Sequence, residues 1–533
     1  MVVTDPVELC SQCHRSFPEQ TNHFSVIEEY LLAHPGNHVP LGSQSVFLYD
    51  AVKETEAQLA GYETDMREST RRYEEKRNAL TSIIQRMRVL VRPSIHHLPP
   101  ETLSSIFLIC RRDSEECWDT RSQRNTSIAL TLSHVCSKWR SISFSLPDLW
   151  SQLNFSFQHG ASEKKARKLH SFATLCLEKS KERPLAISLS VPLYRSVTLH
   201  IPILNDLLRH SHRWRNVEFK MSTDFHLPQS LPMLESLTLW GKLPASDTPA
   251  VSSPLLLDLR LSCIGDDMNL HTRFDIASLT HLTIVDTDCG LEDLFVVLQK
   301  CPMLSSLHFS QCVDDYPDDN ALTPVTLASL RSMTLGNMWS DDEFFSHLTL
   351  PSITHFAVSG SRGDPYYFQV STLIEMLQRS RTESLVSLKF DAVVLDPEPL
   401  VDLLLETPSL ETFDIYDSSA VDNEYEPIIT DWFLQQMTLP RLGHKESAQI
   451  LLPNLIHLHI DTPGDNFESD SLHEMILSRW DKDGWESVEG IQFRQLQSFR
   501  LACSPSNCGK PTMHFLENLR EEGLQVELEL ENV

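Results

Sequence analysis

The stretch LPMLESLTL, at residues 231–239, sets the pattern for the second half of the chain. The same spacing returns in SPLLLDLRL at 253–261, in SLTHLTI at 278–284 and in CPMLSSLHF at 301–309. Each line has the approximate form P-x-L-x-x-L-x-L, and its last apolar residues alternate with polar ones. This alternation is typical of a strand that buries one face.

The line occurs about eleven times. The remaining copies are LRSMTL, PSITHFAV, LVSLKF, PSLETFDI, PNLIHLHI and LQSFRL, after a degenerate opener at Trp214, Val217 and Phe219. First positions from Trp214 to Leu410 are separated by 20, 22, 23, 25, 26, 23, 32 and 25 residues. Leucine-rich repeats have periods of about 20 to 29 residues.

We therefore expect an α/β fold in which residues 156–533 form an irregular leucine-rich-repeat-like solenoid with a curved parallel sheet. Each strand and its return segment would bury their apolar face against the neighbouring coil. Later spacings of 45 and 41 residues, and the absence of the usual asparagine, predict that the coils after about residue 417 are irregular or carry insertions. An ordinary α/β domain is the alternative interpretation.

Charge is distributed unevenly along the chain. There are 73 acidic and 45 basic residues, which gives a formal net charge of −28. The first 220 residues carry 28 basic and 24 acidic side chains, whereas the rest carry 17 and 49. A chain this acidic is not expected to hold nucleic acid through its overall field.

Targeting signals and membrane segments are not expected. The longest apolar runs are far shorter than the roughly 18 residues of a membrane helix, and the first residues do not resemble a signal peptide. The 12 cysteines are scattered through the chain, which favours reduced thiols. We expect a protein of the cytoplasm, the nucleus or both.

Acidic residues gather just after the expected strands. On a solenoid they would form one rim, which could capture a basic target protein; solvated loops that keep the protein soluble are the plainer interpretation. The residues assigned to this acidic rim are Asp286, Asp288, Asp314, Asp315, Asp318, Asp319, Asp341, Asp342, Asp414 and Asp417.

The first 92 residues divide into a polar segment and a long helix. Residues 1–45 contain Cys10 and Cys13 with several histidines, but a second ligand pair at zinc-finger spacing is missing, so we assign no metal site. Residues 46–92 are expected to form a helix, because ten of thirteen positions at heptad spacing between 48 and 90 are apolar. The stripe favours a coiled coil, including a homodimer through residues 48–90, over a helix that packs on the next domain.

Two further segments predict a small helical domain over residues 93–155. These are IHHLPPETLSSIFLIC at 95–110 and ALTLSHVCSKWRSISFSLPDLWSQL at 129–153. One helix would follow the two prolines, a second would run through Trp139, and a short turn would follow Pro147. The order L-P-P-E-x-L-x-x-I-F, L-x-x-V-C-x-x-W-R and L-P-x-L-W resembles the F-box motif of the fungal, mushroom-type family.

The resemblance implies a role as the substrate-recognition adaptor of a cullin-RING ubiquitin ligase. It implies contact with the Skp adaptor through Leu98, Pro99, Leu103, Ile106 and Phe107. The residues that it matches to the core are Val135, Cys136, Trp139 and Trp150. The link at residues 111–127 is longer than in the compact form of the motif.

No motif for catalysis was found. The sequence has no phosphate-binding loop, no dinucleotide fingerprint, no nucleophile elbow and no zinc-protease helix. We therefore expect no enzyme activity and no cofactor. One alternative is a scaffold that dimerises through the coiled coil and binds partners through its acidic repeats without joining a ligase. Another is that the acidic repeats bind a metal ion or hydrolyse a ligand, which requires convergent carboxylates.

Overall fold

The computed structural model describes most of the chain. The described residues are 8–10, 15–16, 23–34, 36, 40, 42–91, 98–112, 118–119, 127–158, 161–192, 199–221, 226–241, 250–263, 270–287, 290–310, 322–337, 341–361, 365–417, 426–440, 450–463, 465–480, 493–504 and 509–530. They form two compact units, Met1–Pro99 and Pro100–Val533.

The first unit is dominated by one helix. Strands β1 (Glu8–Cys10) and β2 (Arg15–Ser16) pair antiparallel, and helix α1 (His23–Ala33) precedes α2 (Ser43–Val91). Helix α2 has 49 residues, as the heptad pattern predicts, and most of its length is solvent-exposed. Part of its apolar stripe is therefore exposed, including Leu59, Met66 and Tyr73.

The second unit begins with the helical subdomain, residues 100–150. It comprises α3 (Pro100–Arg112), α4 (Ile128–Val135), α5 (Ser137–Ser145) and the 3-10 turn η2 (Pro147–Trp150). The second helix predicted from sequence is broken in two, because Cys136 is extended and its Sγ accepts the Trp139 backbone N–H as an N-cap. Apolar periodicity continues across the break, so this pattern could not predict that the helix is interrupted at Cys136.

A sheet of 16 strands forms the rest of the unit. Strands β3 to β10, then β12, β14 and β16 to β20, lie side by side in chain order and pair parallel, while β15 pairs with β16. Their bounds are β3 (Trp118–Asp119), β4 (Gln152–Ser156), β5 (Leu185–Ser190), β6 (Trp214–Lys220), β7 (Ser236–Trp240), β8 (Asp258–Ser262), β9 (His281–Val285), β10 (Ser306–Ser310), β12 (Ser332–Gly336), β14 (His355–Ser359), β15 (Tyr366–Tyr367), β16 (Ser387–Val394), β17 (Thr412–Asp417), β18 (His457–Asp461), β19 (Ser498–Cys503) and β20 (Gln525–Leu530). A separate pair joins β11 (Val325–Thr326) and β13 (Leu348–Thr349).

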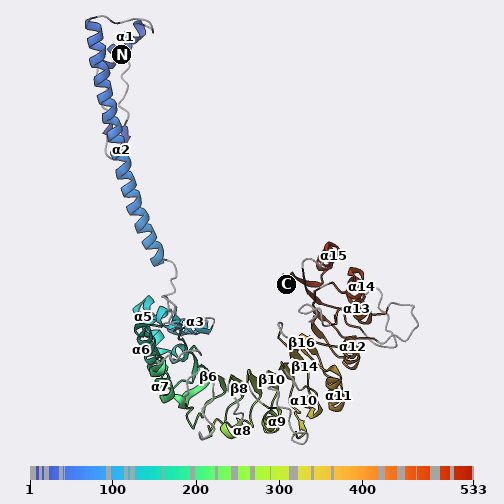
Figure 1. Ribbon diagram of the computed structural model, residues 1–533. Coiled ribbons are helices and arrows are strands. Elements are labelled where there is room, and N and C mark those ends of the chain that lie inside the picture. The colour runs from blue at the N-terminus through green and yellow to red at the C-terminus, as the bar shows by residue number, and fades with distance from the viewer. Residues whose placement is uncertain are drawn as a thin grey trace. The chain divides into compact units, whose positions relative to one another are not determined.

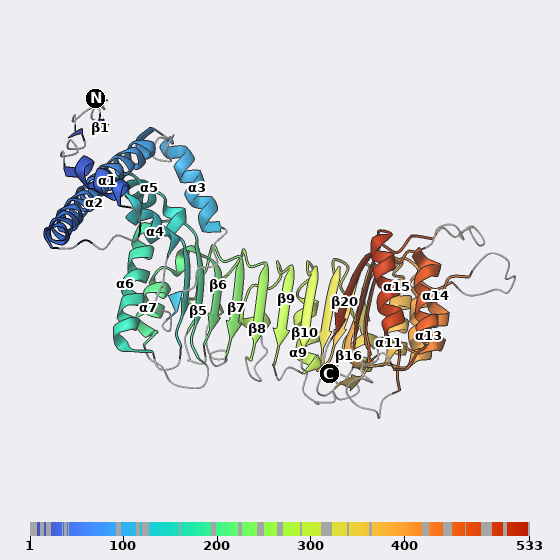
Figure 2. The same cartoon turned by 90° about the horizontal axis from the view of Figure 1, so that it is seen from above.

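Helices cover the outer side of this sheet, and the strands line the inside of its curve (Figures 1 and 2). Their bounds are α6 (Glu163–Lys179), α7 (Ile201–Arg209), η3 (Ser211–Arg213), α8 (Leu270–Arg273), α9 (Leu291–Gln299), α10 (Asp341–Ser346), α11 (Val370–Ser380), α12 (Pro397–Glu406), α13 (Asp431–Met437), α14 (Ser469–Trp480) and α15 (Lys510–Glu521). This is the leucine-rich-repeat-like solenoid that the repeat period predicts.

The core lies between the strands and the outer helices. Pairs such as Leu237 and Leu239, or Leu307 and Phe309, are buried on every strand that matches a repeat line. The strands of the coils after residue 417 keep the pairing of the sheet: Leu458 pairs with Phe413 and then with Phe499 in unbroken register. The extra residues of these long coils lie between the strands, where α13 and α14 are placed.

Several strands of the second unit lie outside the segments that the repeat lines predicted, namely β3, β4, β5, β11, β13, β15 and β20. Strand β20 closes the sheet after the last recognised line, and β3 forms in the long link between the first helices of the helical subdomain. Because β3 pairs with β4, and Arg111 Nη2 donates to the Gln152 carbonyl at 2.9 Å, the helical subdomain joins the solenoid.

Candidate functional site

Helix α3 presents one apolar face inward and another outward. Leu103 and Phe107 have no exposed surface, and the Phe107 ring lies 4.9 Å from that of Trp139, centroid to centroid. Ile106 is half-buried and Ile109 is 55% exposed. The predicted adaptor-contact set is therefore corrected at two positions, since Leu103 and Phe107 hold the helical subdomain together and cannot contact a partner without rearrangement.

The predicted core residues are also divided between the inside and the surface. Trp139 and Trp150 are buried, and Trp150 Nε1 donates to the Ser143 carbonyl at 2.8 Å. Cys136 is half-buried, and Val135 is 50% exposed at the end of α4. Val135 is therefore a surface residue, as Ile109 is on α3.

Leu98 and Pro99 end the first compact unit, directly before α3. Leu98 is half-buried and Pro99 is exposed. Both remain candidates for adaptor contact.

The inner face of the curved sheet is polar. In each repeat line the residue between the two buried apolar residues points away from the helices, and parallel register places these residues in one row across the sheet. The row contains Asn154, Ser188, Glu218, Thr238, Arg260, Thr283, His308, Thr334, Ala357, Lys389, Asp414, His459, Arg500 and Glu527.

Charged members of the inner face lie toward the two ends of the sheet, mostly as ion pairs. At one end Glu218 contacts Lys220 at 2.7 Å, and the Lys220 ammonium lies 5.0 Å from the Trp240 ring centroid. At the other end Lys389 contacts Asp391 at 3.0 Å. The middle of the row, from Thr283 to Ala357, carries no carboxylate, lysine or arginine.

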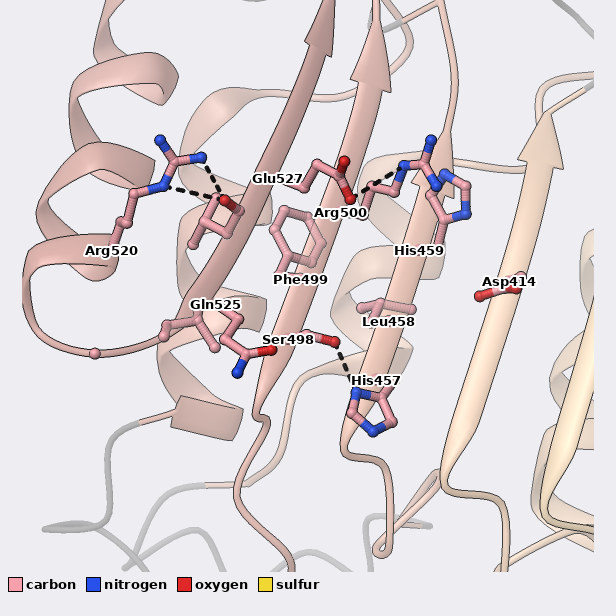
Figure 3. Close-up of a pocket in the computed structure, with 13 residues that line it drawn as sticks. Asp414, His457, Leu458, His459, Ser498, Phe499, Arg500, Arg520, Gln525 and Glu527 are labelled. Carbon is pink, nitrogen blue, oxygen red and sulfur yellow. Dashed lines mark hydrogen bonds and ion pairs between the residues drawn. The ribbon is translucent and has the colours of Figure 1, made fainter. Parts of the chain in front are cut away.

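A pocket of about 630 Å³ lies on the inner face at β17 to β20 (Figure 3). Its polar lining includes Asp414, His457, His459, Ser498, Arg500 and Glu527. Arg500 contacts Glu529 at 2.7 Å, which fixes the guanidinium at one wall. Arg520 Nε donates to the Val526 carbonyl at 3.1 Å and closes the end of the pocket beside the last strand.

His459 lines this pocket and has one ring nitrogen that makes no hydrogen bond to any described residue. Its Nε2 is buried and has no hydrogen-bond partner among the described residues. Burial lowers the pKa of His459, against the opposing effect of Asp414, so the ring is neutral at pH 7. Because Nε2 is buried, a bound polar group pairs with it only if the surrounding side chains move.

The pair formed by His457 and Ser498 does not amount to a catalytic centre. His457 Nδ1 lies 2.7 Å from Ser498 Oγ. Among the described residues no carboxylate is hydrogen-bonded to the other ring nitrogen, as a serine triad would require. The arrangement suits hydrogen bonding to a ligand.

Sequence analysis did not single out His457, His459, Ser498 or Arg500. A signal was available, because each occupies a polar position of a repeat line, as in LHI and FRL. Those positions face the inner side of a solenoid, where partners have access.

The predicted acidic rim is only partly visible. Asp286 is exposed directly after β9, and Asp342 is exposed in α10. Desolvation raises the pKa of Asp342, with a further contribution from Glu375. The side chain of Asp341 and the residues Asp288, Asp314, Asp315, Asp318 and Asp319 lie outside what the structure describes.

Two members of the predicted rim are placed elsewhere. Asp414 lies within a strand on the inner face, beside Lys389 and His459. Asp417 is fully buried, and its carboxylate accepts the backbone N–H groups of Ile428 at 3.2 Å and Ile429 at 3.0 Å. Asp417 therefore fixes a connection in the backbone and is not available to a partner.

Neither a cluster of metal ligands nor a membrane-spanning helix lies within the described ranges. No group of three or more His, Cys, Asp or Glu side chains there is placed to hold a metal ion. None of the described helices combines the length and apolar character needed to span a membrane. The candidate zinc ligand Cys13 lies outside the described residues.

Comparisons with known proteins give structural similarity without sequence similarity. No family model matches the sequence, and no curated protein matches it. A chain of the Rad7 and Elc1 complex in yeast superposes with a TM-score of 0.36 at 16% identity, over 84% of this chain and 98% of that one.

Two other solved structures are also similar. A chain of the TLR13–ssRNA13 complex gives a TM-score of 0.34 at 14% identity, over 62% of this chain and 40% of that one. The circular leucine-rich-repeat protein CroV588 gives 0.22 at 13% identity, over 71% and 59%. At these values the function of the chain has to be argued from its own residues.

Proposed function

We propose that this chain is a non-enzymatic recognition adaptor of a cullin-RING ubiquitin ligase, acting in the cytoplasm, the nucleus or both. In this proposal the helical subdomain binds the Skp adaptor and the inner face of the sheet holds a target protein. The observation that carries it is the exposure of the aliphatic residues Ile109 and Val135, on helices whose sequence resembles the F-box. Exposed aliphatic residues on adjoining helices are what a helical partner would cover.

The second half of the proposal concerns the target. A row of polar side chains on an open sheet gives many hydrogen-bonding positions, and the pocket at Arg500 and His459 gives a concave anchor point. Charged pairs at both ends of the row favour a target with complementary charges of both signs. Whether the acidic rim adds attraction for a basic target stays a prediction.

No reacting group is required of this chain. A target held beside a charged ligase has its lysines at a high effective concentration, so transfer is accelerated by proximity alone. That accords with a helical subdomain and a target surface that belong to one compact unit.

The proposal is tested by titrating the full chain against the Skp adaptor. Changing Ile109→Asp in the exposed part of α3 places a charge in the contact, and we expect at least a tenfold loss of affinity, since a buried unpaired charge costs several kcal/mol. Leu98→Ala with Pro99→Ala tests the preceding residues in the same way. Met303→Asp is the matched control, because Met303 is 57% exposed on the solenoid.

Wild-type binding that survives Ile109→Asp would contradict the assigned surface. A wild-type chain that fails to bind the Skp adaptor at all would contradict the ligase role. The alternative, a dimeric scaffold outside any ligase, would then be favoured by the exposed stripe of α2.

A further inference from the structure

Helix α2 carries an apolar seam that is exposed along the middle of the helix. Leu59, Met66, Tyr73 and Leu80 are each more than half exposed. They occupy alternate seam positions, seven residues apart, on a helix about 70 Å long. Single exposed apolar residues are common, but a continuous stripe of this length is characteristic of a helix that pairs.

The charges of α2 are separated along its length. Residues 43–68 contain six acidic and two basic side chains, a net of −4, whereas residues 69–91 contain six basic and two acidic, a net of +4. One end of the helix is therefore complementary to the other end of a second copy.

The helix macrodipole does not account for this separation. It favours acidic residues in the first turn and basic residues in the last, and its effect falls off within those turns. Near the middle of the 49-residue helix lie Glu63, Asp65, Arg71 and Arg72. The macrodipole does not stabilise charges at that distance from the helix ends. Within the helix Glu63 pairs with Arg67 and Arg71 pairs with Glu75. Asp65 has no ion-pair partner among the described residues, so it is open to a partner at the middle of the helix.

A parallel pair is disfavoured by two contacts. In register, Lys76 would face Lys76 of the second copy in the seam, and Arg72 would flank Arg77 of the second copy. Like charges opposite one another in a seam that excludes water oppose pairing.

An antiparallel pair removes both conflicts. Alignment over almost the whole helix places residue i opposite residue 135 − i, so that Val52 faces Ile83 and Tyr62 faces Tyr73. The polar seam residues Thr55, Ser69 and Lys76 then face Leu80, Met66 and Leu59. Each polar seam residue meets an apolar one, and Lys76 can extend its ammonium group toward the acidic half.

The flanking charges match in the same alignment. Asp65 lies beside Arg72 of the second copy, and Glu56 lies beside Arg77, each twice by symmetry. Glu56, Asp65 and Arg77 are exposed and have no ion-pair partner among the described residues. Arg72 contacts Glu68 at 2.7 Å, but Glu68 also holds Arg71 at 2.7 Å, so Arg72 can turn to Asp65 without leaving Glu68 unpaired.

We infer that α2 docks a second copy of this chain as an antiparallel two-stranded coiled coil, with the acidic half of each helix on the basic half of the other. The last residue of each helix, Val91, then lies at the opposite end of the pair. This inference does not depend on the proposed ligase role.

The test is sedimentation equilibrium of the full chain, which reports the dimer dissociation constant. Glu56→Arg with Asp65→Arg should raise that constant roughly 10- to 100-fold, because four attractive pairs become repulsive at a few tenths of a kcal/mol to about 1 kcal/mol each. Adding Arg72→Glu and Arg77→Glu to the same chain should restore the dimer, since every pair is again opposite in sign. Circular dichroism of each variant checks that the helix is retained.

The matched control is Asp50→Arg with Glu54→Arg, which makes the same change of charge on the outer side of the helix. We expect it to leave the dissociation constant within about threefold of the wild-type value. In a parallel pair Glu56 and Asp65 would face Ala51 and Thr70, so the first variant would have no effect. A wild-type chain that is monomeric at tens of micromolar, an unaffected first variant, or a four-residue variant that fails to recover would each overturn the inference.

Discussion

Buried guanidinium groups take part in holding the coils of the solenoid to one another. Arg213 donates to the Leu177 carbonyl at 3.0 Å, and Arg479 donates to the carbonyls of Leu451 and Leu452 at 3.0 Å each. Arg379, which is exposed, also donates to a carbonyl of another coil, that of Leu348 at 2.6 Å. Buried carbonyl groups need donors, and in these coils, which lack the usual asparagine, arginine supplies them.

Replacing Arg479 tests this role. Burial lowers the pKa of Arg479 to about 9, so the guanidinium is charged at pH 7 and its hydrogen bonds are charge-assisted. Arg479→Leu leaves the carbonyls of Met437, Leu451 and Leu452 without this donor, and we expect it to lower the free energy of unfolding by about 3 kcal/mol or more. Urea unfolding measures the loss. The control is the exposed Arg209→Leu, which should lower the free energy of unfolding by under about 1 kcal/mol. Equal losses for the two variants would contradict the proposed role of Arg479.

Half-buried histidines make stability dependent on pH. Burial lowers the pKa of His308 and is the largest cause of the lowered pKa values of His459 and His473. The unfolded chain therefore binds protons near pH 6.5 while the folded chain does not, and stability falls as pH drops through that value toward the lower folded pKa.

We expect the melting temperature to be lower at pH 5.5 than at pH 7.5, and His308→Asn to reduce the difference. The exposed His226→Asn is the control, because an exposed ring has similar surroundings in the folded and unfolded chain. A pH difference that is unchanged by His308→Asn would show that other groups are responsible.

Single residues also mark where sequence and structure diverge. The 3.6-residue period groups Leu103, Ile106 and Phe107 on one broad stripe, but which part of it faces inward depends on where Trp139 packs. Val135 fits the same period and is exposed because α4 ends there. Asp417 follows its strand as a rim residue would, but backbone N–H groups eleven and twelve residues later enclose it.

At the scale of the element, one close approach of backbone fixes the connection between β14 and β16. A Cβ added to Gly360 would lie 1.9 Å from the Ala392 carbonyl oxygen. Strand β16 is bulged at this point, between Phe390 and Val393. The two segments can therefore meet only where the first has no side chain.

Gly360→Ala should lower the free energy of unfolding by about 3 kcal/mol, since backbone must shift to admit the methyl group. Gly290→Ala is the control, because a Cβ there meets nothing within 4 Å; it should cost under about 1 kcal/mol as a change of N-cap. Thermal unfolding compares the two. Similar shifts in melting temperature for the two variants would mean that the backbone at Gly360 adjusts to a methyl group at little cost.

The elements that sequence reasoning found are those with strong local signals. The heptad stripe predicted α2, and lines such as LPMLESLTL predicted their strands, because period and turn residues are contained within a few positions. Strand β3 has only two residues, and it is defined by pairing of Trp118 with Phe155. This pairing joins residues that are far apart in the sequence. The sequence therefore predicted the long link at residues 111–127 but not the strand within it.

At the scale of the whole molecule, repetition allowed the sequence to predict the architecture. Successive coils repeat the same burial pattern, so stacking them in order follows from the period alone. The candidate pocket did not follow in the same way, because its walls come from four coils and its depth depends on Arg520 and the turn before β20. A polar residue in one repeat line does not predict which side chains the neighbouring coils place beside it.

The order of strands along the sheet follows the order of the chain from β3 to β20 without a crossing. Equivalent residues of adjacent coils, such as Leu259 and Leu282, are direct partners in the ladder. Genetic loss or duplication of the interval between them would change the number of coils while leaving every remaining register intact. The length of the polar inner face can thus vary between descendants of one gene without a change of fold.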